Sequence, residues 1–147
     1  MRILHVANYD FRELAGKFFC TDFKWHNALT RLGHFVYPFS YRDETRNATP
    51  FQTRKLGIKP MQKKLIKTAE NLDPDLLLLA HSELITNQTI ETIKSSHPSM
   101  KIAMYWIDPL WPKKSRSFLA QRLPLLDVLF ATTGGELLSS LHTEISE

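Results

Sequence analysis

The chain has 147 residues, of which 43% are hydrophobic and 23% are charged, a balance that fits one globular domain and excludes an intrinsically disordered protein. Its net charge of +4 is too small to indicate nucleic-acid binding, and the single cysteine, Cys20, excludes a disulfide framework and a thiolate-rich metal site. No apolar run approaches the roughly 20 residues that span a bilayer, and no signal-peptide core is present, so we expect a cytoplasmic protein without a transmembrane segment.

The first part of the chain predicts a strand, a long loop and a helix. Residues 3–7 are an apolar run with His5 as its polar member, which indicates a buried parallel strand. A polar and aromatic loop follows. A helix is then expected to begin at Thr21 or Asp22 and to end at Gly33. Its apolar residues recur at helical spacing: Trp25, Ala28, Leu29 and Leu32.

The middle of the chain predicts a second strand over 34–41, a loop over 42–59 that could contain one helical turn, and a helix that has Pro60 in its first turn. The helical spacing continues until Asp73-Pro74 in three apolar residues: Leu65, Ala69 and Leu72. The run 76–80 is the clearest buried strand of the sequence, because it is short, wholly apolar and preceded by proline.

The last part predicts two further strand and helix pairs. Thr86 is expected to cap a helix that ends before His97-Pro98, and strands are expected over 101–107 and 128–131. A helix from about Ser115 lies between these strands. A short final helix carries three leucines: Leu137, Leu138 and Leu141.

This alternation predicts the fold class and the domain organisation. With right-handed crossovers, it gives an α/β fold with a doubly wound, mostly parallel sheet of about five strands and helices on both faces, which is Rossmann-like. We expect one domain over 1–147, since neither an internal repeat nor a low-complexity linker is present.

Ligands of doubly wound proteins bind outside the carboxyl ends of the strands. Four polar or aromatic segments follow predicted strands there: Asn8-Tyr9-Asp10-Phe11, His81-Ser82-Glu83, Asp108-Pro109-Leu110-Trp111 and Thr132-Thr133-Gly134-Gly135. Each segment also has a structural interpretation. Asn8, Asp10 and Asp108 suit turns, and His81 could be satisfied by nearby backbone. The segment Thr133-Gly134-Gly135 could present backbone N–H groups to an anion or form a tight turn.

Several common sites are excluded by missing motifs. Neither a glycine-rich dinucleotide fingerprint nor a P-loop is present, and histidines at metal-ligand spacing are absent, so we expect no cofactor and no metal. A phospho-receiver domain would need an aspartate where Ala80-His81 ends the third strand. Lys63, Lys64 and Lys67 lie on the outer side of a predicted helix, where a solvated face is favoured over nucleic-acid binding.

Two short motifs carry a family resemblance. The sequence MRILHV at 1–6 and the sequence ALTRLGHFV at 28–36 resemble the opening of GT-B glycosyltransferases, in which M-[KR]-I-L-x-[VI] precedes a helix that ends in L-x-x-L-G-H-x-V. In this pattern Leu29 and Leu32 pack on the sheet and Gly33 closes the helix. The segment 73–82 resembles the third strand of the same fold, and two later segments, 105–111 and 127–134, are similar to the spore-maturation CgeB-like, family 4-like branch.

The resemblance implies the N-terminal, acceptor-side domain of a two-domain glycosyltransferase of the hexosyltransferase type. Such an enzyme moves a sugar from a nucleotide-sugar donor to an acceptor hydroxyl. The donor would be bound mainly by a missing C-terminal domain, so this domain would be inactive alone. Asp108 or His81 would be the general base. The small-molecule or glycan acceptor would be bound by seven residues, with the aromatic ones stacking on it: Asn8, Tyr9, Asp10, Phe11, Ser82, Glu83 and Trp111.

A different class of function stays open. The same topology suits a stand-alone flavodoxin-like or receiver-like binding or regulatory module that acts through protein contacts. Nucleic-acid binding through residues 54–67 ranks last, because the local basic excess is mild.

Overall fold

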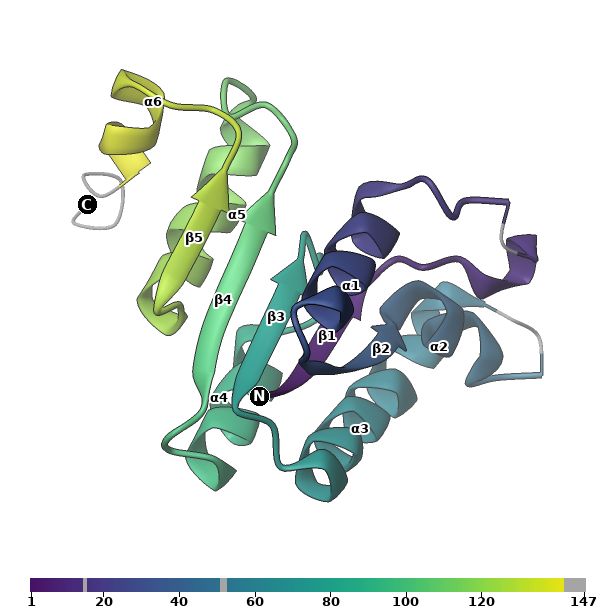
Figure 1. The fold of residues 1–147 in the computed structure, drawn as a ribbon. Helices are drawn as coiled ribbons and strands as arrows, with labels where there is room; N and C mark the ends of the chain where they lie inside the picture. The colour runs from purple at the N-terminus through teal and green to yellow at the C-terminus, as the bar shows by residue number, and fades with distance from the viewer. Residues whose placement is uncertain (15, 51–52, 142–147) are drawn as a thin grey trace.

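Five parallel strands form one sheet in the order β2-β1-β3-β4-β5 in the computed structural model, which describes residues 1–14, 16–50 and 53–141 (Figure 1). The strands are β1 (Arg2–Ala7), β2 (Phe35–Ser40), β3 (Leu76–Ala80), β4 (Lys101–Trp106) and β5 (Val128–Ala131). The order places β1, the first strand of the chain, inside the sheet between β2 and β3. All pairings are parallel, as predicted.

Helices flank both faces of this sheet, so the predicted doubly wound, Rossmann-like architecture is confirmed. They are α1 (Thr21–Arg31), α2 (Tyr41–Asn47), α3 (Arg54–Leu72), α4 (Asn87–Ser96), α5 (Lys113–Arg122) and α6 (Glu136–Ser139), with 3-10 turns η1 (Phe11–Glu13) and η2 (Leu123–Leu125). None of the helices in the described ranges is long and apolar enough to cross a membrane.

The larger core lies between the sheet and helices α3, α4 and α5. Alternate residues of each strand point to this side, such as Leu4 and Val6 of β1 and Leu77 and Leu79 of β3. All four side chains are fully buried. Because both faces of the central strands are covered, β1 and β3 are apolar without alternation, which is why they were recognisable in the sequence. Burial of each such side chain contributes about 1.5–3 kcal/mol to folding.

The smaller core lies on the opposite face, which α1 covers. The helical side chains of this cluster are Phe23, Trp25 and Leu29, all from α1. The ring of Trp25 stacks on Tyr105 of β4 with centroids 5.1 Å apart. In Figure 1, the α1 ribbon lies over β1 and β3 and does not extend over β5. Of the rings that α1 carries, only that of Trp25 approaches Phe130 of β5, with centroids 5.8 Å apart. Phe130 of β5 is accordingly 49% exposed.

The prediction of a loop with one helical turn over 42–59 underestimates the helix in this segment. Residues 41–47 form α2, and α3 begins at Arg54, so that Pro60 lies inside the helix rather than in its first turn. A proline there removes one N–H donor from the helix, but tertiary packing holds the preceding turns. Gly57 packs so closely on α2 that a Cβ atom would lie 1.7 Å from the carbonyl oxygen of Thr45.

The junction between α1 and β2 also differs in detail from the expectation. Gly33 has a φ of 82°, in the left-handed region that favours glycine, and follows the helix as predicted. Leu29 packs on the sheet, but Leu32 is 72% exposed, so the expected packing of Leu32 is wrong. Leu32 is the C-cap residue, with φ of −76° and ψ of 4°, and has left the helical face that contacts the sheet.

Candidate functional site

A pocket of about 290 Å³ opens at the carboxyl ends of β3 and β4. We call it the rim pocket, and its lining residues are Arg42, His81, Glu83, Trp106, Asp108, Lys114, Ser115 and Phe118. Three of the predicted site residues, from two different loops, therefore meet in one cavity. Its volume is near the lower limit for small-molecule sites and suits a ligand about the size of one sugar ring.

A larger pocket of about 520 Å³ lies between η2, β5 and α6, away from the strand carboxyl ends. Its lining is mainly leucine, and Asp127 is its one charged residue within the described part of the chain. That carboxylate already accepts hydrogen bonds from Lys101 and from the backbone N–H of Ile102. The two hydrogen bonds hold the pKa of Asp127 below its usual value, and the bond from Lys101 has the larger effect. The larger pocket thus offers no free group for chemistry, and the rim pocket is the better candidate.

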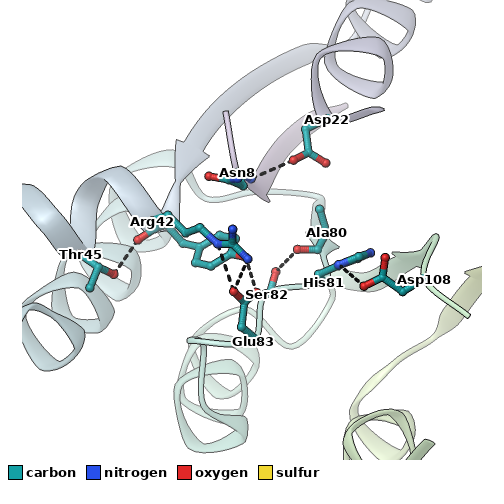
Figure 2. Close-up of polar contacts among 10 residues, drawn as sticks. Asn8, Asp22, Arg42, Thr45, Ala80, His81, Ser82, Glu83 and Asp108 are labelled. Atoms are coloured by element: carbon teal, nitrogen blue, oxygen red, sulfur yellow. Dashed lines mark hydrogen bonds and ion pairs between the residues drawn. The ribbon is translucent and has the colours of Figure 1, made fainter. Parts of the chain in front are cut away.

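His81 and Asp108 form an oriented pair in the rim pocket (Figure 2). Nδ1 of His81 lies 3.4 Å from a carboxylate oxygen of Asp108, and Nε2 accepts a long hydrogen bond of 3.4 Å from the backbone N–H of Ile107. These contacts favour the tautomer that carries its proton on Nδ1. Nε2 then has the lone pair, held only by a weak hydrogen bond, and can accept a proton from a bound hydroxyl group.

The backbone holds this histidine in an uncommon conformation. His81 and Ser82 have φ values of 50° and 52°, in the left-handed region that non-glycine residues seldom adopt. Such a residue costs about 1–2 kcal/mol, and pairs of this kind concentrate at functional sites. The ring of His81 stacks on the buried indole of Trp106 with centroids 4.6 Å apart, and this contact fixes the position of the imidazole ring.

Ser82 closes the crevice between β1 and β3, where the strand order reverses. Its hydroxyl donates to the carbonyl of Ala80 at 2.9 Å and lies 3.3 Å from that of Val6, so it joins the carboxyl ends of the two strands. Ser82 is fully buried and cannot contact an acceptor as expected. Ligands commonly bind at this switch point. Here the serine occupies it, and the open pocket lies one strand further along, beside β4.

Glu83 is held by two residues that follow β2. Arg42 donates to one carboxylate oxygen from Nε at 3.1 Å and from Nη2 at 2.5 Å, and the Tyr41 hydroxyl donates to the other (Figure 2). Burial by itself raises the pKa of Glu83, but the hydrogen bonds from Tyr41 and Arg42 outweigh burial and hold the pKa below its usual value. Glu83 is thus an ionised anchor for Arg42 and a weak candidate for a base.

The loop after β1 does not reach the rim pocket. Tyr9 is 1% exposed, its ring stacks against Phe11 at 5.2 Å, and no face is open to a sugar, so the expected stacking of Tyr9 on an acceptor is corrected. Asp10 is bound by Lys17 and lies 3.8 Å from Arg46. This pairing with Lys17 lowers the pKa of Asp10.

The other two residues of that segment, Asn8 and Phe11, remain at least partly exposed to solvent. The backbone N–H of Asn8 donates to Asp22 at 3.0 Å, and that of Phe11 donates to Asp43 at 2.9 Å. The ring of Phe11 remains 48% exposed. Both residues lie outside the lining of the rim pocket. The segment therefore serves mainly to connect the loop to α1 and α2.

A buried polar network explains why Tyr9 points inward. His5 is fully buried, with Nδ1 2.5 Å from the Tyr9 hydroxyl and Nε2 2.9 Å from the Tyr105 hydroxyl. Tyr105 donates to Asp22 of α1 at 2.6 Å, so its oxygen accepts from Nε2–H, and Tyr9 donates to Nδ1. Burial, with a smaller effect of His26, lowers the pKa of His5 to about 3. The network keeps His5 neutral and ties α1 to the sheet.

The remaining predicted residues lie elsewhere on the rim. Trp111 is 68% exposed and does not line the pocket, although its carbonyl oxygen accepts a hydrogen bond of 2.8 Å from Arg116. Thr133, Gly134 and Gly135 form the turn from β5 into α6. Gly135 has a φ of 68° and stands at the N-cap of a four-residue helix, which agrees with the tight-turn interpretation.

Sequence reasoning missed five lining residues: Arg42, Trp106, Lys114, Ser115 and Phe118. Arg42 could have been found by the rule used for the other loops, because it follows the carboxyl end of β2. The predicted strand ran to Tyr41 and hid that position. Trp106 ends β4 and points toward α5, and α5 begins two residues before the expected Ser115, which places Lys114 in its first turn.

Within the described ranges, no group of three or more histidine, cysteine, aspartate or glutamate side chains is arranged to hold a metal ion. Comparison with known proteins adds no relative: neither the scan against protein-family models nor the search of curated proteins returns a match. What is established is a doubly wound α/β protein with a small polar pocket at the carboxyl ends of its third and fourth strands.

Proposed function

We propose that the chain is the acceptor-side domain of a GT-B type sugar transferase, in which the rim pocket binds the acceptor and the His81–Asp108 pair activates its hydroxyl group. The observation that carries the proposal is the orientation of His81, whose Nδ1 faces Asp108 at 3.4 Å while the ring borders an open pocket. An imidazole held by a carboxylate is a common general base.

The chemistry assigned to the pair balances without a further reactant beyond the donor. Nε2 of His81 takes the proton of the acceptor hydroxyl, and Asp108 stabilises the resulting imidazolium. The hydroxyl oxygen forms a bond to the anomeric carbon of the donor sugar. The bond from that carbon to the nucleoside diphosphate breaks, and the diphosphate leaves with the electron pair. The donor is held mainly by a second domain that faces the rim.

The genomic reading frame and the activity of its product test this function. We expect the frame to continue past codon 147 into a second domain of similar size, and a stop codon there contradicts the proposal. In the longer product, His81→Gln is expected to lower transfer at least about 100-fold, as for the loss of a general base. Asp108→Asn lowers it less, because the imidazole remains. His34→Gln, near the opposite ends of the strands, is the control and keeps full activity.

A second function is favoured by one observation, the strand order. The order β2-β1-β3-β4-β5 is that of flavodoxin-like proteins, several of which act as binding or regulatory modules. Under this alternative, the chain ends naturally at Glu147 and forms a defined dimer or partner complex. Sedimentation equilibrium of the purified chain separates the two proposals: a stable dimer without any saccharide binding supports the module.

A further inference from the structure

The two outer strands of the sheet differ in how well their free edges are protected. An edge strand presents unpaired N–H and C=O groups to other chains, and a proline or a charged residue commonly blocks this pairing. The edge strand β2 contains Pro38. Phe35 donates its N–H to the carbonyl of Met1 on the β1 side, and this direction alternates along a strand. The nitrogen of Pro38 therefore faces outward, where it offers no donor.

The other edge strand, β5, has no such protection. Its sequence, VLFA at 128–131, contains neither proline nor a charged residue. The N–H of Thr132 donates to the carbonyl of Trp106 of β4 at 3.1 Å, so the alternation directs the N–H groups of Leu129 and Ala131 outward. Within the described residues, β5 pairs only with β4. Its outward backbone groups are thus available to another strand.

Apolar surface lies on both faces of this open edge. On the face that α1 covers, Val128 and Phe130 are exposed. On the opposite face, the larger pocket of about 520 Å³ is lined by Leu129, by Leu123 of η2 and by Leu138 of α6. In Figure 1, α6 lies on the outer side of β5, away from β4. A strand added to β5 covers the exposed pair with one face and places side chains in the larger pocket with the other.

We infer that β5 is a self-association edge, at which two copies of the chain pair antiparallel around a twofold axis beside Leu129. The strand is complementary to itself in this register. Leu129 of each copy exchanges backbone hydrogen bonds with Leu129 of the other, which agrees with its outward N–H. Val128 of each copy lies opposite Phe130 of the other, where antiparallel side chains are closest, and aromatic and β-branched residues pair favourably. No like charges meet, because the strand carries none.

This pairing limits itself to two chains. It joins two sheets through β5 and leaves the two β2 strands, each with Pro38, as the outer edges. A twofold contact in which both copies use the same surface closes after one partner, so it forms a dimer and not a fibre. The strand is short, so the interface is small and we expect weak association.

Sedimentation equilibrium of the purified chain tests the dimer between about 10 µM and about 1 mM, the range of weak complexes. We expect the weight-average mass to rise with concentration from one chain toward two and to stop there. A mass of one chain at the highest concentration overturns the inference, and so does a mass that passes two chains.

Two charge variants test the register. Phe130→Lys and Val128→Glu, each confirmed as folded by circular dichroism, are expected to weaken self-association at least about tenfold. In an equimolar mixture the two new charges lie opposite each other and one Val128–Phe130 pair is intact, so dimerisation returns. Phe35→Lys, at an exposed ring of β2, is the control and changes association less than about twofold. A mixture that stays monomeric, or an equal loss in the control, overturns pairing through β5.

Hydrogen exchange at Leu129 identifies what covers the edge. We expect exchange of this outward amide to slow as concentration rises, whereas the outward amide of Val36 on β2 exchanges at the same rate throughout. If the mass stays at one chain and Leu129 is protected equally at every concentration, another part of the same chain covers the edge and the second copy is refuted.

The inference goes beyond the proposed function and does not depend on it, because no residue of β5 lines the rim pocket. A dimer that binds saccharide agrees with both. A monomer that binds saccharide refutes the β5 dimer and leaves the acceptor site, and a β5 dimer without saccharide binding does the reverse.

Discussion

His5 shows how one buried side chain makes the stability of the protein depend on pH. It is fully buried between Tyr9 and Tyr105, and its neutral ring uses both nitrogens, one as donor and one as acceptor. A proton on Nδ1 would replace an acceptor by a second donor beside the Tyr9 hydroxyl. The low pKa of about 3, caused mainly by burial, expresses this preference for the neutral form.

We expect the unfolding free energy to fall as pH drops from 6.5 toward 4.5. In this range the unfolded chain protonates His5 and the folded chain does not, so acid favours unfolding by up to about 1.4 kcal/mol per pH unit. Burial also lowers the pKa of His26, which adds to the slope. Carboxylates with lowered pKa, such as Asp10 and Asp127, act only at more acidic pH.

Urea unfolding at several pH values measures this slope. His5→Gln has no proton to gain and is expected to flatten the curve between pH 6.5 and 4.5, even if it is less stable at pH 7.5. His34→Gln, outside the network, keeps the wild-type slope. An unchanged slope in the His5 variant would show that another group controls the acid sensitivity.

At the scale of elements, the contact between α2 and α3 depends on one glycine. A Cβ atom at residue 57 would lie 1.7 Å from the carbonyl oxygen and 2.7 Å from the carbonyl carbon of Thr45. Both are backbone atoms of α2 and cannot move without the helix. Gly57→Ala is therefore expected to destabilise the protein by about 1–3 kcal/mol, although alanine is the better helix former.

The matched control for this variant is Gly134→Ala, where nothing lies within 4 Å of the added atom. That change is expected to alter the unfolding free energy by less than about 0.5 kcal/mol. Chemical denaturation of the two variants side by side decides the matter. Equal effects of the two substitutions would contradict the close approach of α2 and α3.

The start of α4 depends on a single hydroxyl group. Thr86 accepts a hydrogen bond of 3.2 Å from the backbone N–H of Thr89, and its hydroxyl also donates to Gln62 of α3 at 2.8 Å. Thr86→Ala is expected to cost about 1–2 kcal/mol of stability, the usual range for a lost N-cap. Thr92→Ala, an exposed threonine within α4, is the comparison and should change the denaturation midpoint little.

The elements that could be predicted are those stabilised by apolar side chains. The strands over 76–80 and 128–131 are continuous apolar runs, and their bounds were found to the residue. Helix α2 has no such signal, because its buried residues include Asp43 and Thr45, which are held by hydrogen bonds. Polar burial depends on partners far along the chain, so periodicity could not reveal it.

The candidate site was predictable in position but not in orientation. The carboxyl-end rule placed His81, Glu83 and Asp108 on one edge of the sheet, and they line one pocket. The same rule selected Tyr9 and Ser82, whose side chains turn back into the protein to bind His5 and the end of β1. A position in the chain determines the edge on which a residue lies, whereas its hydrogen-bond partners determine which way it points.

At the scale of the whole molecule, the two faces of the sheet are covered unequally. On the face that α1 covers, Val128 and Phe130 of β5 are 46% and 49% exposed. Adjacent exposed apolar side chains attract hydrophobic dyes and partners. The double variant Val128→Thr, Phe130→Thr places β-branched residues, which favour strands, at both positions and is expected to lower dye fluorescence with little change in stability.

Phe35 supplies the control for this prediction. It is 58% exposed on β2, at the opposite edge of the sheet. Phe35→Thr removes a comparable exposed ring and should leave most of the dye signal in place. If the two variants reduce the signal equally, exposure of single rings, and not the uncovered face, accounts for the dye binding.

The central place of β1 has a consequence for how the protein is made. The first strand to leave the ribosome pairs on one side with β2, but on the other side residues 3–6 pair with 76–79. The backbone hydrogen bonds along the β3 side of β1 therefore cannot form until more than half of the described chain has been synthesised. During that interval an apolar strand is open to mispairing, and its closure is a slow, long-range step. Translation speed across residues 40–80 is thus expected to influence the yield of folded protein.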